Sequence, residues 1–593
     1  MSYTAPVKDM LFNMQHLANI EQIAQIPGFE DAGLDTAAAV LEECAKFTEG
    51  VLAPLNFEGD KNPSSWKDGV VTATPGFKDA FRQLTEGGWQ GLQHPADFGG
   101  QGLPKTIGAA CTEMLNSANM SFALCPLLTD GAIEALLTAG SDELKAIYLE
   151  KLISGQWTGT MNLTEPQAGS DLALVRTKAD PQPDGTYKIF GTKIYITWGE
   201  HDMAENIVHL VLARLPGAPP GVKGISLFLC PKFLINDDGT LGEHNDLACT
   251  SIEHKMGIHG SPTASMSFGD GGGAIGYLVG EPNQGLACMF TMMNHARLNV
   301  GLEGVGISER AYQRARAYAL ERVQGKPLLS GSTAIAGHPD VRRMLMDMKA
   351  RTEAMRALAY FCAGQMDRAA GHADAQERAQ AQALVGLLIP VVKGWCTDSA
   401  QGITSDGVQV HGGMGYVEET GASQHMRDAR ITTIYEGTTG IQANDLIGRK
   451  LAREGGRTLK ALLGRIDGDA RRLVESPDAV LAQIGRALAA AAQALDEAVD
   501  WLLAHDGQPA QCAAGAVPFL RLAGTVIGGW LSARMAEAAT AQLAAGAGDA
   551  GFLGTKRATA SHYAAHVLVQ APMLRDIVTG GAASTLALAD DQL

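Results

Sequence analysis

Residues 427–450 read RDARITTIYEGTTGIQANDLIGRK, and the one acid within the run of small and apolar residues is Glu436. A carboxylate held next to Ile434 and Tyr435 loses solvation, which disfavours its charged form and raises its basicity toward neutral pH. These are the properties of a general base. The alternative interpretation is an ordinary glutamate at the start of a helix, beside the positive end of the helix dipole. This stretch alone does not separate the two.

The same stretch predicts its own local structure. We expect an extended segment that stops at Glu436-Gly437 and is followed by a short amphipathic helix. Gly437 permits a tight turn of the backbone, and the Thr438 hydroxyl is placed to cap the helix. The candidate base is therefore expected on a turn.

Length and charge limit the classes of protein to consider. The chain has 593 residues, more than a single hydrophobic core accommodates, so three or four domains are expected. With 46% hydrophobic and 19% charged residues, its composition is that of an ordinary globular protein. The net charge of −17 disfavours binding to nucleic acid or to an anionic membrane through bulk electrostatics.

Cysteine usage and hydropathy bear on location. The nine cysteines stand singly, without a Cys-x-x-Cys pair, which favours a reducing compartment and a cytoplasmic protein. The start, MSYTAPVKDMLFNM, lacks the apolar core and cleavage site of a signal peptide. The most membrane-like run, Ala513 to Trp530, contains Pro518 and Arg521, so we expect a buried helix and no membrane span.

Periodicity divides the chain into four parts and predicts an α+β, mainly α protein. We expect a helical N-terminal domain over 1–157, a small middle β-barrel over 158–280, a C-terminal helical bundle over 281–450 and an extra helical domain over 451–593. The middle part shows short runs with partial alternation and tight turns between them. The other parts show helical spacing of apolar residues.

Individual elements follow from the same patterns. Helices are expected over Leu34 to Leu52, ended by Pro54, and near Gly76 to Glu86. Further helices are expected along 341–362, from Ala381 to Thr404 with a kink at Pro390, and over 479–505, 513–543 and 555–578. Strands are expected over 206–215, 224–229 and 263–268.

Two further motifs suggest chemistry that the surrounding sequence disfavours. Residues 271–276, GGGAIG, formally match a dinucleotide fingerprint, but YLVGEPNQG follows where a helix is required. His244, Cys249, His254 and His259 suggest a zinc site, but they lack the paired ligands two to four residues apart that such sites favour. We expect strand and loop residues in both cases, and no metal.

Four motifs resemble those of the acyl-CoA dehydrogenase family. They are IYEGTTGIQ around Glu436, TEPQAGSD at 164–171, KIYIT at 193–197 and VQVHGGMGY at 408–416, and the resemblance covers about residues 35–450. It implies FAD-dependent introduction of a 2,3-double bond into an acyl-CoA thioester, with Glu436 as the base. The EGTTGIQANDL segment and the long C-terminal extension most resemble the subgroup that includes 3-methylmercaptopropionyl-CoA dehydrogenase, which also contains medium- and long-chain acyl-CoA enzymes.

The resemblance implies a set of cofactor contacts. The residues expected to bind FAD are Leu163, Thr164, Gly169, Ser170, Tyr195, Thr197, Arg322, Gln409, Gly412, Gly413 and Thr438. Tyr195 and Thr197 lie two apart in a predicted strand, so they point to the same face. The segment from Gln409 through His411 to Gly413 is expected to reach the FAD of a neighbouring subunit, which requires an oligomer, most simply a dimer.

The sequence departs from the family pattern at three of these places. Tyr195 stands where Trp is common, and Gly440 stands where Gln is frequent near the adenine end of FAD. The stretch ERVQGKPL around Arg322 departs from the common Arg-x-x-Phe-Gly pattern. Arg322 is still the candidate cation for the FAD pyrophosphate, with a solvated arginine at a helix end as the alternative.

The resemblance also implies substrate contacts. Ser170, Asn294, Arg297 and Gly437 match positions near the thioester and CoA chain, and the Glu436 amide is expected to donate to the thioester oxygen. Some relatives carry their base just before this arginine, but that position here is Ala296. The alternative for Arg297 is a structural ion pair inside the bundle.

The expected partners are an acyl-CoA substrate and an electron-transfer flavoprotein. A first alternative is an acyl-CoA oxidase, whose reduced flavin reacts with oxygen. A second is a nucleic-acid-associated member of the fold, but residues 451–593 hold 12 Lys and Arg against 14 Asp and Glu, a net −2 that offers no basic face. The sequence therefore favours the dehydrogenase.

Overall fold

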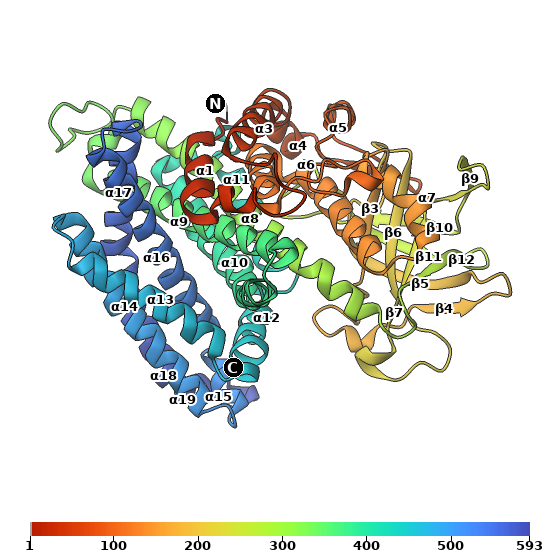
Figure 1. Cartoon of the computed structure of the whole chain (residues 1–593). Coiled ribbons are helices and arrows are strands. Elements are labelled where there is room, and N and C mark those ends of the chain that lie inside the picture. The colour runs from red at the N-terminus through yellow and green to blue at the C-terminus, as the bar shows by residue number, and fades with distance from the viewer. Residues whose placement is uncertain (1–2) are drawn as a thin grey trace.

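The computed structural model describes residues 3–593, with the side chains of residues 290–293 outside the description. Figure 1 shows three long helices in the centre of the molecule, a β-sheet on one side of them and a second group of helices on the opposite side. This arrangement confirms an α+β, mainly α protein with a middle β domain and a helical C-terminal extension.

The N-terminal part is helical. Its longer helices are α1 Val7–Asn13, α3 Leu34–Phe47, α4 Ala53–Lys61, α5 Phe77–Glu86, α6 Lys105–Ala139 and α7 Asp142–Ile153. The prediction that Pro54 ends the first long helix is wrong, because a π-helical turn joins α3 to α4 and Pro54 lies in the first turn of α4. In a first turn the missing N–H of proline costs nothing.

The middle part forms one eight-stranded sheet in the order β10-β11-β5-β12-β7-β6-β3, with β4 paired to β5. Its strands are β3 Trp157–Asn162, β4 Lys178–Pro181, β5 Tyr187–Thr197, β6 Asn206–Ala213, β7 Ser226–Pro231, β10 Leu247–Ile252, β11 Thr263–Phe268 and β12 Ala274–Val279. β5 is the longest and joins two halves of the sheet, because one end pairs with β11 and the other with β12 and β4. The glycine-rich run at 271–276 leads into β12 and not into a helix, so it is a connection between strands.

Three long helices form the central bundle: α8 Gly285–Glu321, α9 Pro339–Gly371 and α10 Ala375–Val410. α9 confirms the helix predicted along 341–362, and its Met344, Met348 and Met355 are buried. After α10 the chain forms α11 Ala422–Ala429, a 3-10 turn over Arg430–Thr433 and α12 Thr439–Asn444. The extended segment predicted before Glu436 is thus wrong, while the Thr438 cap is confirmed, since its hydroxyl accepts from the Ile441 N–H at 3.3 Å.

The C-terminal part adds α13 Arg457–Val474, α14 Ala479–Ala504, α15 Pro509–Ala514, α16 Ala516–Ala544, α17 Ala550–His566, α18 Ala571–Gly580 and α19 Ala582–Thr585. The single helix predicted over 555–578 is two helices, because a 3-10 turn at Leu568–Gln570 separates them and Pro572 opens the second. In Figure 1 these helices lie along the side of the bundle away from the sheet.

By length and composition, α6, α10 and α16 could each cross a membrane. Within the protein, however, 83%, 78% and 83% of their most apolar windows are buried against other elements. Their apolar surfaces therefore belong to the protein core.

The helical parts are joined at one buried cation, Arg356 on α9. Its guanidinium contacts Glu113 of α6 at 2.6 Å, Asp9 of α1 at 2.6 Å and Glu309 of α8 at 2.8 Å. The Arg356 side chain is 1% exposed. Asp9 in turn pairs with Lys556 of α17, which extends the network to the C-terminal part.

Replacing Arg356 tests how much this cation contributes to the stability of the fold. Arg356→Ala leaves the fully buried Glu113 carboxylate without its main partner, and breaking a buried pair from one side costs about 3–5 kcal/mol. We expect a lowered thermal midpoint, whereas Arg82→Ala, which removes an exposed ion pair with Asp79, is expected to change stability by about 1 kcal/mol or less. Equal melting of the two variants would contradict this role for Arg356.

Candidate active site

The candidate base lies on a strained turn. Glu436 has φ +54°, in the left-handed region that costs a residue with a side chain about 1–2 kcal/mol, and Gly437 follows at φ +84°. The buried Gln442 amide donates to the carbonyl oxygens of Glu436 at 3.1 Å and Gly437 at 3.2 Å. Lys393 Nζ donates to the Gly437 carbonyl at 2.7 Å. The surroundings therefore fix a conformation that the chain alone disfavours.

Burial raises the pKa of Glu436, and the charges of Lys393 and Arg297 oppose this rise. No hydrogen-bond donor among the described residues contacts the Glu436 carboxylate, and no acceptor among them takes its main-chain N–H. Both groups are thus available to a bound molecule. A carboxylate with reduced solvation and no direct donor is suited to accept a proton.

A second carboxyl lies behind the turn, and sequence reasoning missed it. Glu303 on α8 is fully buried, and its Oε2 accepts a hydrogen bond from the hydroxyl of Tyr435, the residue before Glu436. Burial raises the pKa of Glu303 to about 8, although Tyr435 and Lys393 act in the opposite direction. Glu303 is therefore mainly neutral at pH 7.

Lys393 on α10 completes this group. Its side chain is buried, and burial lowers its pKa to about 8, although Glu436 and Glu303 act to raise it. The ammonium therefore remains mainly protonated at pH 7, close to both carboxyls. Lys393 lies in the middle of a helix that reads as apolar, so the sequence gives little sign of this role.

Arg297 and Asn294 lie three residues apart on α8. Arg297 is 5% exposed, and its Nη1 pairs with Asp445 Oδ2 at 3.3 Å, while its Nε has no hydrogen-bond partner among the described residues. Asn294 is half-buried. The geometry thus shows the structural ion pair that was the alternative for Arg297, together with one donor that the pair leaves unused.

The sequence motifs at 164–171 and 193–197, both in the β domain, are held together by a buried ion pair. Glu165 accepts from Lys193 Nζ at 2.8 Å and from the Thr177 hydroxyl at 2.6 Å. Although burial opposes it, Lys193 lowers the pKa of Glu165 to about 2. Lys193 also donates to the Leu163 carbonyl at 3.1 Å, and Ile194 N–H donates to Thr164 at 3.0 Å.

This pairing fixes the predicted cofactor residues of the two motifs beside one another. Gly169 and Ser170 are exposed in the loop, Thr164 and Thr197 are half-buried, and Tyr195 is 60% exposed. Leu163 packs into the same hydrophobic cluster as Tyr435, so the loop and the Glu436 turn share one core.

Strand alternation does not orient Tyr195 as simply as predicted. β5 carries a register shift against β11 between Lys193 and Ile196, and Tyr195 has φ +60°. The bulge interrupts the regular alternation of side chains at this point. The spacing of Tyr195 and Thr197 therefore does not by itself place them on one face.

A cavity of about 540 Å³ lies beside the Glu436 turn. It is lined by Thr438, Thr439 and Gly440 on one side and by Met256 and Met426 among others. A cavity of this size accommodates part of a large cofactor or substrate. Gly440 adds no side chain to this lining.

The remaining predicted cofactor residues form a separate group. Tyr318 on α8 stacks on His411 with ring centroids 4.5 Å apart, which brings the end of α8, with Arg322, next to the segment from Gln409 to Gly413. Arg322, Gln409, Gly412 and Gly413 are all exposed, and nothing lies within 4 Å of a Cβ built on either glycine. Gln409 follows Lys393 by 16 residues on α10, roughly 24 Å along a helix.

Three features of the site match the parts of FAD. The anchored loop at 163–170 presents hydroxyls and open glycine backbone, and the cavity at Thr438 to Gly440 gives space for a bulky group. The glycines at 412–413 permit close approach of a phosphate. The residues present therefore fit a long, partly planar and phosphate-bearing cofactor.

Comparison with known proteins covers almost the whole chain. Family models match in order: acyl-CoA dehydrogenase, N-terminal domain, at 35–156; the middle domain at 160–270; the C-terminal domain at 283–451; and acetyl-CoA dehydrogenase C-terminal like at 462–589. A 3-methylmercaptopropionyl-CoA dehydrogenase of Ruegeria pomeroyi is 51% identical over 96% of this chain and 97% of its own. A broad-specificity linear acyl-CoA dehydrogenase of Mycobacterium tuberculosis, FadE5, is 36% identical over 97% of each chain.

Solved structures agree on the fold. Caenorhabditis elegans ACDH-11 in complex with C11-CoA aligns with a TM-score of 0.75 and 20% identity, over 98% of this chain and 96% of its own. Butyryl-CoA dehydrogenase of Megasphaera elsdenii aligns with a TM-score of 0.56 and 27% identity, over 70% of this chain and 98% of its own. Family models along nearly every part of the sequence, and a relative at 51% identity from end to end, agree with the motifs around Glu436: the chain belongs to the acyl-CoA dehydrogenase family and is an FAD-dependent oxidoreductase.

Proposed function

We propose that this enzyme dehydrogenates 3-methylmercaptopropionyl-CoA, or a linear acyl-CoA of similar or greater length, to the 2-enoyl-CoA. The observation that carries the proposal is the half-buried carboxylate of Glu436 on its strained turn, which no hydrogen-bond donor among the described residues contacts. The substrate class is supported by the names of the two relatives at 51% and 36% identity.

Glu436 removes the α-proton of the thioester, and the electron pair left on Cα forms the new double bond. When bound, FAD would supply the acceptor for the hydride from Cβ, which no side chain can provide. The free N–H of Glu436 donates to the thioester oxygen and stabilises the negative charge that develops there, an effect typically worth about 3 kcal/mol. Lys393 and Arg297 add positive charge near the same centre.

In this proposal Glu303 is a positioning residue. It holds the Tyr435 hydroxyl, and Tyr435 fixes the start of the turn that carries Glu436. Its neutral form at pH 7 avoids a second negative charge beside the base. The substrate contacts of Ser170, Asn294, Arg297 and Gly437 complete the proposed site.

We also propose an electron-transfer flavoprotein as the acceptor of the electrons, as the family resemblance implies. Reoxidation of the reduced enzyme in stopped flow separates this from the oxidase alternative, since an oxidase is reoxidised rapidly by oxygen alone. All nine cysteines are free thiols, eight of them buried, which supports a reducing, cytoplasmic location.

The function is tested by flavin bleaching with a panel of acyl-CoAs. We expect 3-methylmercaptopropionyl-CoA and linear acyl-CoAs to bleach the wild-type flavin. Glu436→Gln keeps the shape of the side chain but removes the base, so bleaching is expected to slow by about 10²–10⁴-fold while FAD absorbance per protein stays constant. Glu419→Gln, at an exposed acid, is the matched control. Near-normal bleaching in the Glu436 variant would remove this residue from the role of base.

Glu303→Gln tests the positioning role through pH. The variant still accepts a hydrogen bond from Tyr435 but cannot ionise. In the wild type, Glu303 gains a negative charge as pH rises through about 8, and this charge makes Glu436 a stronger base. We expect the step of the flavin-reduction profile near pH 8 to become smaller in the variant, because only Lys393 still titrates there beside Glu436, with similar rates at about pH 6.5.

The control for this experiment is Glu321→Gln, which changes an exposed acid on the same helix. A purely structural Glu303 would change melting temperature and leave the pH profile unaltered. That result would contradict the proposed coupling to Glu436.

We propose an oligomer, most simply a dimer, in which the segment from Gln409 to Gly413 reaches the FAD of the other subunit. The position of this segment supports the proposal, because Gln409 lies 16 residues beyond Lys393 along α10 and so well removed from the Glu436 turn along that helix. Large apolar side chains are also exposed around it: Leu320, Val323, Leu328, Met414, Tyr416 and Val417. Exposed apolar patches of this kind mark protein interfaces.

Charge placed in this patch is expected to dissociate the oligomer. Leu328→Asp combined with Tyr416→Asp should give a monomer with reduced FAD content, measured by light scattering and flavin absorbance. Leu588→Asp, at an exposed apolar residue near the C-terminus, is the control. A wild-type protein that is yellow, active and monomeric near 62.3 kDa would refute the assembly.

A further inference from the structure

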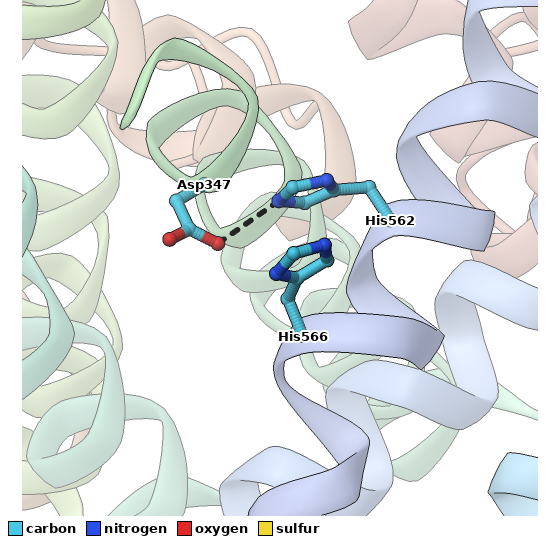
Figure 2. Close-up of side chains that lie close together, drawn as sticks. All are labelled: Asp347, His562 and His566. Carbon is cyan, nitrogen blue, oxygen red and sulfur yellow. Dashed lines mark hydrogen bonds and ion pairs between the residues drawn. The ribbon is translucent and has the colours of Figure 1, made fainter. Parts of the chain in front are cut away.

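Two histidines and an aspartate converge where the C-terminal extension meets the bundle. His562 and His566 lie four residues apart on α17, and Asp347 lies on α9. Figure 2 shows both imidazole rings directed toward the Asp347 carboxylate. One potential ligand atom from each residue lies within 4.8 Å of the other two.

The arrangement is already assembled by direct contacts. His562 Nε2 lies 3.0 Å from Asp347 Oδ1, and the two imidazole rings stack with centroids 4.0 Å apart and planes 13° apart. Histidines at positions i and i+4 of a helix lie on the same face, which is how paired helical histidines ligate zinc. The stacking therefore places two nitrogens beside one carboxylate oxygen.

Contacts near the cluster hold α9 and α17 at a fixed separation. One to two turns earlier on α17, the Thr559 hydroxyl donates to Glu353 of α9 at 2.7 Å, and Lys556 pairs with the same carboxylate at 3.1 Å. Tyr563 fixes the opposite side of α17 by donating to the Thr525 carbonyl of α16 at 3.1 Å. The separation of α9 and α17 at the histidines is therefore set by packing and not by the histidines themselves.

Charges around the cluster favour one mode of binding. Arg343 Nη1 lies 3.3 Å from Asp347 Oδ2, which leaves Oδ1 facing the imidazoles. Arg351 and Asp406 also interact electrostatically with Asp347, and their charges are opposite to each other. Asp347 is thus suited to give one oxygen to a cation while the other stays paired with Arg343.

We propose that Asp347, His562 and His566 bind a divalent transition-metal ion, preferentially zinc, that clips the C-terminal extension to the bundle. Two imidazole nitrogens and one carboxylate oxygen suit zinc and its neighbours in the first transition row, and they do not suit magnesium or calcium, which prefer oxygen ligands. In a tetrahedral zinc site the ligand atoms lie about 3.3 Å apart and each imidazole plane contains the metal, so binding requires the two stacked rings to rotate about their side-chain bonds as the ligand atoms move inward. His566 is exposed, so water takes the fourth position.

The site is tested on the full-length enzyme loaded with FAD. After treatment with EDTA and desalting, the protein is titrated with zinc chloride by calorimetry, and its melting temperature is measured with and without zinc. We expect one zinc ion per chain, binding at micromolar concentration or below, and a higher melting temperature with zinc because the ion binds only the folded state.

His566→Ala is the principal variant, because its exposed side chain can be removed without disturbing the core. Loss of a residue that only orients a metal ligand typically weakens metal binding about tenfold or more. Loss of His566, a ligand itself, should therefore weaken zinc binding by more than about tenfold. It should also abolish the zinc-dependent rise in melting temperature. Asp347→Asn, which keeps the size of the side chain, should also weaken binding. Both variants should retain the FAD content of the wild type.

The matched control is His505→Ala. His505 also stacks on a neighbouring ring, that of Trp501, at 4.2 Å, but it belongs to no such group of ligands among the residues described. It should leave zinc binding unchanged. Wild-type enzyme that takes up no stoichiometric zinc, or a His566 variant that binds zinc as tightly as the wild type, would overturn the proposal.

Discussion

The fold depends on keeping one desolvated guanidinium fully paired. Arg356 cannot shed its charge, so its burial is tolerable only if acids from other elements surround it. Glu113, Asp9 and Glu309 supply them from three separate helices, and Lys556 continues the network through Asp9. Each acid has to be in place for the others to be buried. The N-terminal helices, the bundle and the C-terminal extension are therefore specified together and not as independent units.

The candidate active site uses the opposite arrangement. Glu436 is also partly desolvated, but no donor among the described residues contacts its carboxylate directly, and Lys393 and Arg297 act on it only through space. Gln442 and Lys393 instead donate hydrogen bonds to backbone carbonyls of the turn. The enzyme thus fixes the position of the base without satisfying its charge. This is preorganisation in the physical sense, because the cost is met by folding before the substrate arrives.

Sequence reasoning reached those parts of the fold and site that local pattern determines. The helix along 341–362, the Thr438 cap and the place of Glu436 on a turn all follow from residues close together in the chain. The extended segment predicted before Glu436 failed because the β-branched residues at 431–434 favour strands locally, whereas packing in the same core as Leu163 places them in a 3-10 turn. The roles of Glu303 and Lys393 could not be predicted from the sequence. Each depends on contact with the turn at Glu436, which lies 133 residues after Glu303 and 43 residues after Lys393. Tyr195 was assigned to a face by alternation, which a bulge in β5 interrupts.

The pairing of Asp9 with Lys556 joins positions 547 residues apart in the sequence. While the chain is being synthesised, Asp9 and Arg356 emerge long before the helix that carries Lys556. Until that helix is present, the charge network around Arg356 and Asp9 lacks one of its cations. Such a long-range closure also raises contact order, which slows folding. The same contact that unites the folded protein therefore cannot form until α17 has been synthesised.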